Sequence, residues 1–194
     1  MLTSRDPRLV ERVGVLSLHG MSSGAWNRYS ARGSWFYEID EPGYKCNMGD
    51  IQAALGLRQL DSADEFRRRR EAIARIYVEE LGSEEAVKLP VSCDNGTHAW
   101  HLYPVQVDLQ ALTIDRDAFI RALKSEGVGT SVHFIPIHYH AYYSRHLDYG
   151  PGSFPVAEEF FSRAISLPIY PSMTDSDARD VATALRRIAN YYRR

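Results

Sequence analysis

This sequence of 194 residues has little cysteine, no long apolar run and no excess of basic charge. Its two cysteines, Cys46 and Cys93, are too few for a disulfide framework, and their spacing fits no zinc site. No stretch approaches the roughly 20 apolar residues that a membrane helix needs. The N-terminus lacks the basic region and apolar core of a signal peptide. These absences favour a globular protein of the reducing cytoplasm, with no membrane partner.

The charge balance gives no indication of a nucleic-acid partner. The formal net charge is −2 at pH 7, and 25% of the residues are charged. The strongest basic run, Arg67–Arg70, is flanked on both sides by acidic residues, so it is typical of a solvated helix face. A hydrophobic content of 44% is ordinary for a globular fold.

The first half of the chain predicts two helices separated by a long loop. Asp6 and Pro7 form a favoured helix start, and apolar residues at helical spacing continue from there to Gly20. Residues 21–42 predict a loop rich in aromatic side chains, and a loop of this kind is expected to pack against another surface. Residues 49–82 then predict one long helix whose apolar stripe belongs to a core.

Strand and helix patterns alternate after Pro90. Strands or extended segments are predicted at 101–107, 128–134 and 165–171. Helices are predicted after a capping Asp115, near 142–147, over 156–164, and from a capping Thr174 to Tyr191. This alternation indicates an α/β fold, with an α+β arrangement in the second half.

The most informative segment is Gly43–Ala54, in which a glycine-led loop with a polar amide runs directly into a helix. Further short motifs accompany it in a fixed order: His19–Met21, His101–Tyr103, Val132–His138, Pro155–Glu158 and Ser166–Pro171. Each motif is weak by itself, but their order and spacing extend over nearly the whole chain. The series resembles the C-terminal half of the DegT/StrS family, the pyridoxal 5′-phosphate (PLP)-dependent aminotransferases of nucleotide sugars.

The resemblance implies the C-terminal part of the fold-type-I PLP-transferase fold. Residues 1–48 would be the tail of the large PLP-binding domain together with an aromatic interface loop. Residues 49–82 would be a long interdomain helix, and residues 83–194 a small C-terminal α+β domain. The chain would then correspond to an enzyme that begins about halfway along.

The resemblance also directs attention to a missing group, because enzymes of this family form a Schiff base through a lysine. The chain has only Lys45, Lys88 and Lys124, and none of them matches the position of that catalytic lysine. We therefore assign no catalytic residue in this chain. Cofactor chemistry would belong to the complete enzyme.

Asn47 is the residue that the resemblance assigns to the cofactor, as a contact to the PLP phosphate of the other subunit. A side-chain amide can donate to a phosphate oxygen without adding charge. The residues alone also allow Asn47 to be a loop or helix-capping asparagine. Cys46 stands where relatives often have an aromatic residue, so the packing of this loop could differ.

His133 and His138 flank a proline turn, and the resemblance places this segment near the sugar substrate. Imidazole suits contacts to hydroxyl and diphosphate groups near neutral pH. The residues alone equally allow partly buried histidines that bond to loop carbonyls. A metal site that also uses His140 is disfavoured, because no further ligand follows at typical spacing.

Two functions remain open from the sequence. The first is an aminotransferase acting at C4 of a 4-keto nucleotide sugar, with this chain as a truncated or separately encoded half that is inactive alone. The second is a non-catalytic interaction module that dimerises with a full-length relative. The expected partners are a second copy or such a relative, a nucleotide sugar, and an amino donor that is usually glutamate in the family.

Overall fold

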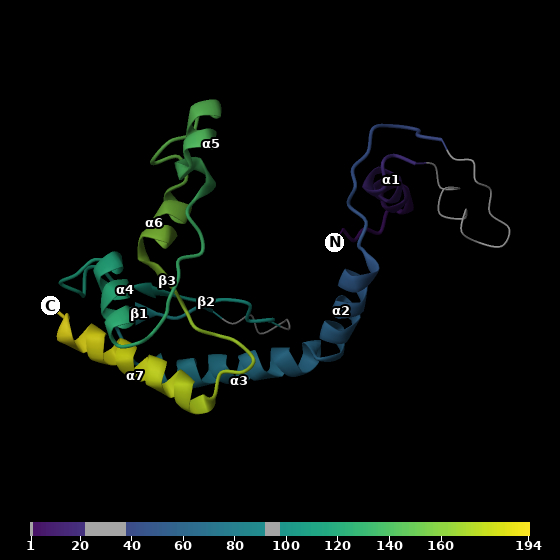
Figure 1. Ribbon diagram of the computed structural model, residues 1–194. Coiled ribbons are helices and arrows are strands. Elements are labelled where there is room, and N and C mark those ends of the chain that lie inside the picture. The colour runs from purple at the N-terminus through teal and green to yellow at the C-terminus, as the bar shows by residue number, and fades with distance from the viewer. Residues whose placement is uncertain (1, 22–37, 92–97) are drawn as a thin grey trace. The chain divides into compact units, whose positions relative to one another are not determined.

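The computed structural model describes residues 2–21, 38–91 and 98–194 (Figure 1). The chain divides into two compact units, residues 1–61 and 62–194. Most of the expected aromatic loop and Cys93 lie outside the described residues. Among the helices of the described parts, none is both long enough and apolar enough to cross a membrane.

The first unit contains two helices without a buried residue. Helix α1 spans Pro7–Ser17 and begins as the sequence predicts, because the Asp6 carboxylate accepts a hydrogen bond from the backbone N–H of Arg8 at 3.0 Å. Helix α2 spans Asp50–Asp61. Neither helix buries a side chain within the described residues, so this unit has no apolar core of its own there.

The structure differs from the expected single helix over residues 49–82. Helix α2 ends at Asp61, helix α3 spans Ala63–Leu81, and Ser62 lies between them with φ −98° and ψ −1°. Aspartate and serine are weak helix formers, which makes this a favourable place for a break. The expected core stripe is correct only for α3, whose buried residues are Ile73, Ala74, Ile76, Tyr77 and Leu81.

The second unit is built on a three-stranded antiparallel sheet in the order β1-β2-β3. The strands are β1 (Val87–Lys88), β2 (Tyr103–Val107) and β3 (Ala164–Leu167). Two of the predicted extended segments are thus confirmed in shorter form. The strand expected over 128–134 is wrong, because within that range only Ser131 pairs with the sheet, through a single bridge to Ser166. Glycine at 127 and 129 weakens the strand tendency there.

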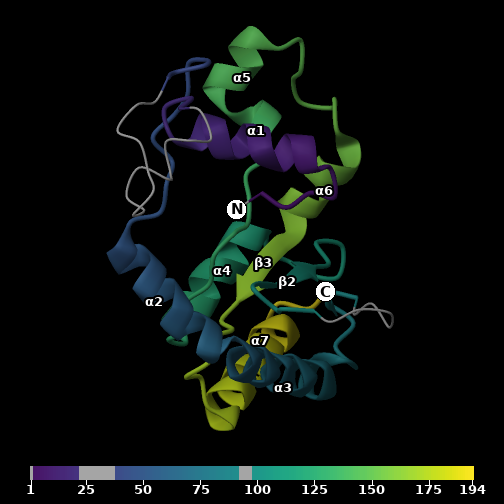
Figure 2. The same cartoon turned by 90° about the vertical axis from the view of Figure 1, so that its right-hand side faces the viewer.

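Three helices complete the layer that covers the sheet. Helix α4 spans Arg116–Ser125 and α7 spans Asp175–Tyr191, and both begin at the caps that the sequence predicts. Asp115 accepts a hydrogen bond from the N–H of Ala118 at 2.7 Å, and Thr174 forms a reciprocal capping box. Helices α3 and α7 lie side by side along the unit (Figure 2).

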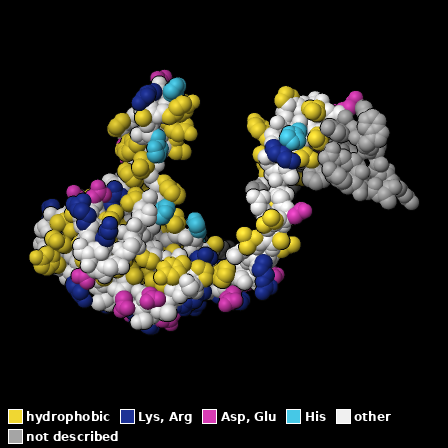
Figure 3. Space-filling view, viewed as in Figure 1, with side chains coloured by type: hydrophobic (Ala, Val, Ile, Leu, Met, Phe, Trp, Pro, Cys, Tyr) yellow, Lys and Arg dark blue, Asp and Glu magenta, His cyan; other side chains and the backbone are white. Residues whose placement is uncertain are grey.

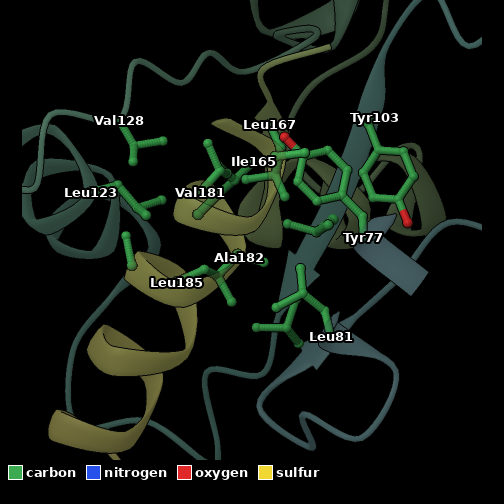
Figure 4. Packing of buried hydrophobic residues seen from close by; sticks show 14 of the residues in the cluster. Tyr77, Leu81, Tyr103, Leu123, Val128, Ile165, Leu167, Val181, Ala182 and Leu185 are labelled. Atoms are coloured by element: carbon green, nitrogen blue, oxygen red, sulfur yellow. The ribbon is translucent and has the colours of Figure 1, made fainter. Parts of the chain in front are cut away.

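The core lies between the sheet and these helices (Figure 4). On β2 the side chains alternate, so that Tyr103, Val105 and Val107 are buried. The Tyr77 and Tyr103 rings lie 4.9 Å apart, and the Tyr77 hydroxyl donates to the Pro168 carbonyl at 2.7 Å. Apolar residues of α7 fill the interior from the other side; they include Val181, Ala182 and Leu185.

An arm formed by residues 132–163 projects from the sheet of the second unit (Figure 1). It contains the 3₁₀ turn η2 (Ile137–Tyr139), α5 (Ala141–His146) and α6 (Pro155–Arg163). The two helices predicted near 142–147 and over 156–164 are confirmed. The arm returns directly into β3, the strand that pairs with β2, and it carries both histidines singled out by the sequence.

Candidate functional site

Asn47 lies on an exposed segment that is held at its base by backbone hydrogen bonds. Three such bonds, of 2.6–2.8 Å, join residues 44–46 to residues 16–19. Lys45 also forms an isolated bridge with Leu18. Residues 47 and 48 follow this ladder immediately and are exposed to solvent. The amide of Asn47 is therefore carried on a short segment whose starting point is fixed.

Two glycines allow the base of this segment to form. Gly20 has φ +73°, and a Cβ there would lie 1.6 Å from the Glu41 carbonyl oxygen. At Gly43 a Cβ would lie 2.1 Å from the backbone nitrogen of Gly20. The two backbone stretches approach so closely that only glycine fits at either position. Both glycines belong to the motifs that carry the family resemblance.

Asn47 does not occupy the capping position of α2. That position belongs to Gly49, whose backbone N–H donates to the side-chain oxygen of Gln52 at 3.0 Å. A glutamine that reaches back in this way satisfies one of the unpaired N–H groups at a helix start. The capping alternative for Asn47 therefore lacks support in the geometry, and its assignment to the cofactor stays a prediction.

His138 lies in the arm and is only 7% exposed. Its Nε2 is 2.9 Å from Oε1 of Glu158, at the start of α6. The imidazole also packs against two aromatic rings, with centroids 4.5 Å away for Tyr139 and 4.9 Å away for Phe154. One ring nitrogen is thus engaged by the protein itself.

Glu158 accepts several hydrogen bonds within the arm, and the sequence analysis named it only as the last residue of the Pro155–Glu158 motif, without a role at the site. Its carboxylate accepts hydrogen bonds from the backbone N–H of Gly152, at 2.9 Å to both oxygens, and from that of Phe154 at 3.1 Å. The Gly152 bond is the main reason that the pKa of Glu158 is lowered to about 2. No spacing rule connects a histidine with a glutamate twenty residues later, so the pair has no signal in the sequence.

His133 occupies the root of the arm and is half-buried. Its Nδ1 lies 2.8 Å from the Ser166 hydroxyl on β3. A mostly apolar hollow of about 620 Å³ lies along the arm and is lined by Phe134, Pro136, Ser153–Ala157 and Phe160. Figure 3 shows histidine and hydrophobic side chains gathered along the arm. Among the described residues, no three histidine, cysteine or acidic side chains lie close enough together to hold a metal ion.

The structure brings His133 and His138 onto one arm of the second unit, whereas Asn47 belongs to the first unit. Each histidine has one ring nitrogen bonded to a polar side chain from a more distant part of the sequence. Their assignment to the sugar therefore depends on the other ring nitrogen of each histidine, Nε2 of His133 and Nδ1 of His138.

Comparison with known proteins gives a consistent result. A model of the DegT/DnrJ/EryC1/StrS aminotransferase family matches residues 1–186. The spore coat polysaccharide biosynthesis protein SpsC of Bacillus subtilis (strain 168) is 50% identical over 189 residues, which cover 97% of this chain and 49% of SpsC. The chain thus spans about half the length of the curated relatives it matches.

Solved structures agree. The aminotransferase TlmJ from Streptoalloteichus hindustanus matches with a TM-score of 0.79 at 30% identity, covering 96% of this chain and 46% of TlmJ. The PMP form of Spr1654 from Streptococcus pneumoniae matches with a TM-score of 0.84 at 28% identity, covering 97% of this chain and 46% of Spr1654.

These matches confirm the expected fold, a mixed helix and sheet arrangement that corresponds to about half of a PLP aminotransferase. The cofactor of the family is pyridoxal 5′-phosphate, and the structures of Spr1654 include both its PLP and PMP forms. Because the family model covers nearly the whole chain, this chain belongs to the DegT/DnrJ/EryC1/StrS aminotransferase family.

Proposed function

We propose that this chain forms one half of a PLP-dependent aminotransferase that acts on a 4-keto nucleotide sugar in the synthesis of amino sugars or polysaccharides. The observation that carries the proposal is the family match over residues 1–186 by a chain half the length of its relatives. When bound, pyridoxal 5′-phosphate supplies an electron sink for chemistry at the amino-bearing carbon. The low cysteine content and the family membership both support placing the proposed enzyme in the reducing cytoplasm.

Asn47 fits a role in holding the phosphate of the cofactor. It is an exposed amide on a braced segment, three residues before the first residue of α2. The start of a helix carries partial positive charge and favours anions. The amide N–H of Asn47 adds a neutral donor beside it. We assign this contact to the cofactor of a partner subunit, which makes a dimer part of the proposal.

His133 and His138 are assigned to the sugar. Both sit on the arm, beside aromatic surface that suits a sugar or base, and Phe134 is 74% exposed there. A neutral imidazole can accept from a hydroxyl, and a charged one can donate to a diphosphate. The two histidines therefore bind and orient substrate in this proposal, and neither transfers a proton to carbon.

The proposal assigns the transfer of protons to a lysine that this chain does not supply. Lys45, Lys88 and Lys124 are its only lysines, and none of them matches the catalytic position in the family resemblance. A covalent nucleophile contributes many orders of magnitude to rate. We therefore expect that this chain alone, incubated with PLP, glutamate and a 4-keto nucleotide sugar, forms no 2-oxoglutarate. Turnover at the rate of a full enzyme would show that one of the three lysines has taken the role.

A second function remains in view, because α2 exposes several large apolar side chains: Ile51, Leu55, Leu57 and Leu60. Such a surface suits association, so the chain could act as a non-catalytic module that dimerises with a full-length relative. The coding sequence upstream of Met1 distinguishes the two. An in-frame continuation with the lysine supports the half-enzyme, whereas a genuine start site supports the module.

The role of Asn47 can be tested by supplying this chain to a dissociated full-length relative such as SpsC. In the mixed dimer, Asn47→Ala should weaken PLP retention by the worth of one charge-assisted hydrogen bond, about 1.5–3 kcal/mol. Asn190→Ala removes another exposed amide, on α7, and serves as the matched control. If Asn47→Ala lowers the stability of the chain but leaves PLP retention in the mixed dimer unchanged, the residue is structural and the assignment fails.

A further inference from the structure

Glu158 makes polar contacts with three parts of the arm. Its side chain is 15% exposed, and its two oxygens accept from the backbone of Gly152 and Phe154 and bond to His138. The donors come from η2, from the turn before α6, and from the first residue before that helix.

The direction of the His138 bond follows from the charge of its partner. An ionised carboxylate is an acceptor only, and the backbone donors of Gly152 and Phe154 favour the ionised form. Nε2 of His138 must therefore carry the hydrogen whenever the bond exists. A neutral His138 then has a bare Nδ1, since neutral imidazole has one donor and one acceptor nitrogen.

The second ring nitrogen is left to a ligand. No hydrogen bond from a described residue reaches Nδ1 of His138. With Nε2 held by Glu158, a neutral His138 can only accept at Nδ1, so it suits the O–H of a sugar hydroxyl and not a carbonyl or phosphate oxygen. A carboxylate that fixes the tautomer of a ligand-binding histidine is a known arrangement in metal sites, and the same chemistry applies here.

Glu158 also holds the turn that precedes α6. Gly152 has φ +90°, a conformation that directs its N–H at both carboxylate oxygens. Phe154, whose ring packs on His138, donates to the same carboxylate. One side chain therefore links the turn, the aromatic ring and the imidazole across residues 138–158.

We propose that Glu158 is the positioning residue of the arm: it fixes neutral His138 in the Nε2–H form and so makes Nδ1 an acceptor for a sugar hydroxyl. The part that concerns the sugar rests on the proposed function, while the tautomer and the shape of the arm do not. Glu158 touches no substrate in this proposal and acts only through His138 and the 150–154 turn.

Nitrogen NMR of the histidine rings tests the tautomer without any ligand. When the imidazole is neutral, His138 of the wild-type chain should show a protonated Nε2 and an unprotonated Nδ1. In Glu158→Gln, whose amide can donate as well as accept, the two ring-nitrogen shifts should move toward each other as the tautomers mix. Glu159→Gln is the matched control, because Glu159 neighbours Glu158 on α6 and its carboxylate pairs with Arg163. A wild-type His138 protonated at Nδ1 would overturn the proposal, as would an unchanged spectrum in Glu158→Gln.

Amide hydrogen exchange tests the shape of the arm in the same three proteins. Glu158→Gln should speed exchange over residues 138–154 on the order of tenfold, as for the loss of one charge-assisted hydrogen bond, and leave α7 unchanged. Equal protection in all three would contradict the positioning role.

Titration with UDP-glucose as a nucleotide-sugar probe then separates the two proposals. If Glu158→Gln binds UDP-glucose more weakly than the wild type and Glu159→Gln does not, the result supports both the sugar contact and the positioning role of Glu158. If none of the three proteins binds UDP-glucose, the proposed sugar contact fails. The role of Glu158 is then judged by the His138 tautomer in the spectrum of the wild-type chain.

Discussion

The two units of this chain are stabilised in different ways. In residues 62–194 a sheet and three helices enclose a core in which residues such as Phe119, Ile165 and Leu185 are fully buried. In the described part of residues 1–61, neither helix buries a side chain, and order comes from backbone ladders and glycine contacts. Because burial of apolar area is the main source of stability, the first unit is expected to be the weaker one by itself. It also carries Asn47, the residue proposed to act on a partner.

The largest expected difference comes from the same substitution made in each unit. Leu185→Ala in α7 removes a fully buried side chain and should lower the free energy of unfolding by about 2–5 kcal/mol. Leu55→Ala in α2 removes a side chain that is 62% exposed and should change it by no more than about 0.5 kcal/mol. Urea unfolding followed by circular dichroism measures both. Equal losses would mean that α2 belongs to a core, and the comparison would fail.

A glycine pair provides the next test, on the first unit alone. Gly43→Ala forces a Cβ against the backbone of Gly20 and should weaken the 44–46 ladder by about 1–3 kcal/mol, the usual cost of local backbone strain. Gly56→Ala is the control, since nothing lies within 4 Å of its Cβ, and it should stabilise α2 by about 0.5–1 kcal/mol. Hydrogen exchange of residues 44–46 is the measurement. Unchanged protection in Gly43→Ala would show that the close approach is not rigid.

Substitution of the helix caps is expected to have smaller effects, which again differ between the two units. Asp115 caps α4 in the second unit, and Asp6 caps α1 in the first. Asp115→Ala should cost about 1 kcal/mol of global stability, because α4 packs in the core through Phe119 and Leu123. Asp6→Ala should loosen α1 only and leave the melting of the second unit unchanged. A common shift in both variants would indicate that the two units unfold together.

The most local effect is expected in the arm and depends on pH. Hydrogen bonds from backbone N–H groups, mainly that of Gly152 and also that of Phe154, lower the pKa of Glu158 to about 2 from an ordinary value near 4.5. A lowered native pKa contributes stability that is complete above the ordinary value and is lost as the pH falls toward the native one. Protection of residues 138–154 should therefore decline between about pH 4.5 and pH 2. In Glu158→Gln this decline should be absent, and its persistence would assign the effect to another carboxylate.

Local signals in the sequence were reliable where one residue determines one contact. Asp6, Asp115 and Thr174 each cap the helix that the sequence predicts, because a capping side chain bonds to N–H groups only two or three residues away. Gly43 was recognised as part of a loop, although its reason, a backbone 2.1 Å from where its Cβ would be, could not be read from the sequence.

Errors arose where distant residues decide. The helix expected over 49–82 breaks at Ser62, and only its second part is buried, because burial depends on the sheet that packs against it. The strand expected over 128–134 makes a single bridge, at Ser131, before the chain leaves the sheet for the arm. The spacing of hydrophobic residues predicts a buried helix or a strand, but it does not reveal whether another segment of the chain packs against that helix or pairs with that strand.

The family, most of the helices, two of the three strands and the candidates Asn47, His133 and His138 could be predicted from the sequence, because these depend on local motifs and their spacing. How those candidates are held is visible only in the folded structure. The pairing of His138 with Glu158 joins residues far apart in the chain, and no local pattern encodes it. The same holds for His133 and Ser166. The His138–Glu158 bond needs the two sides of the arm to lie together, and the His133–Ser166 bond needs the root of the arm to lie against β3, so both depend on contacts between distant segments.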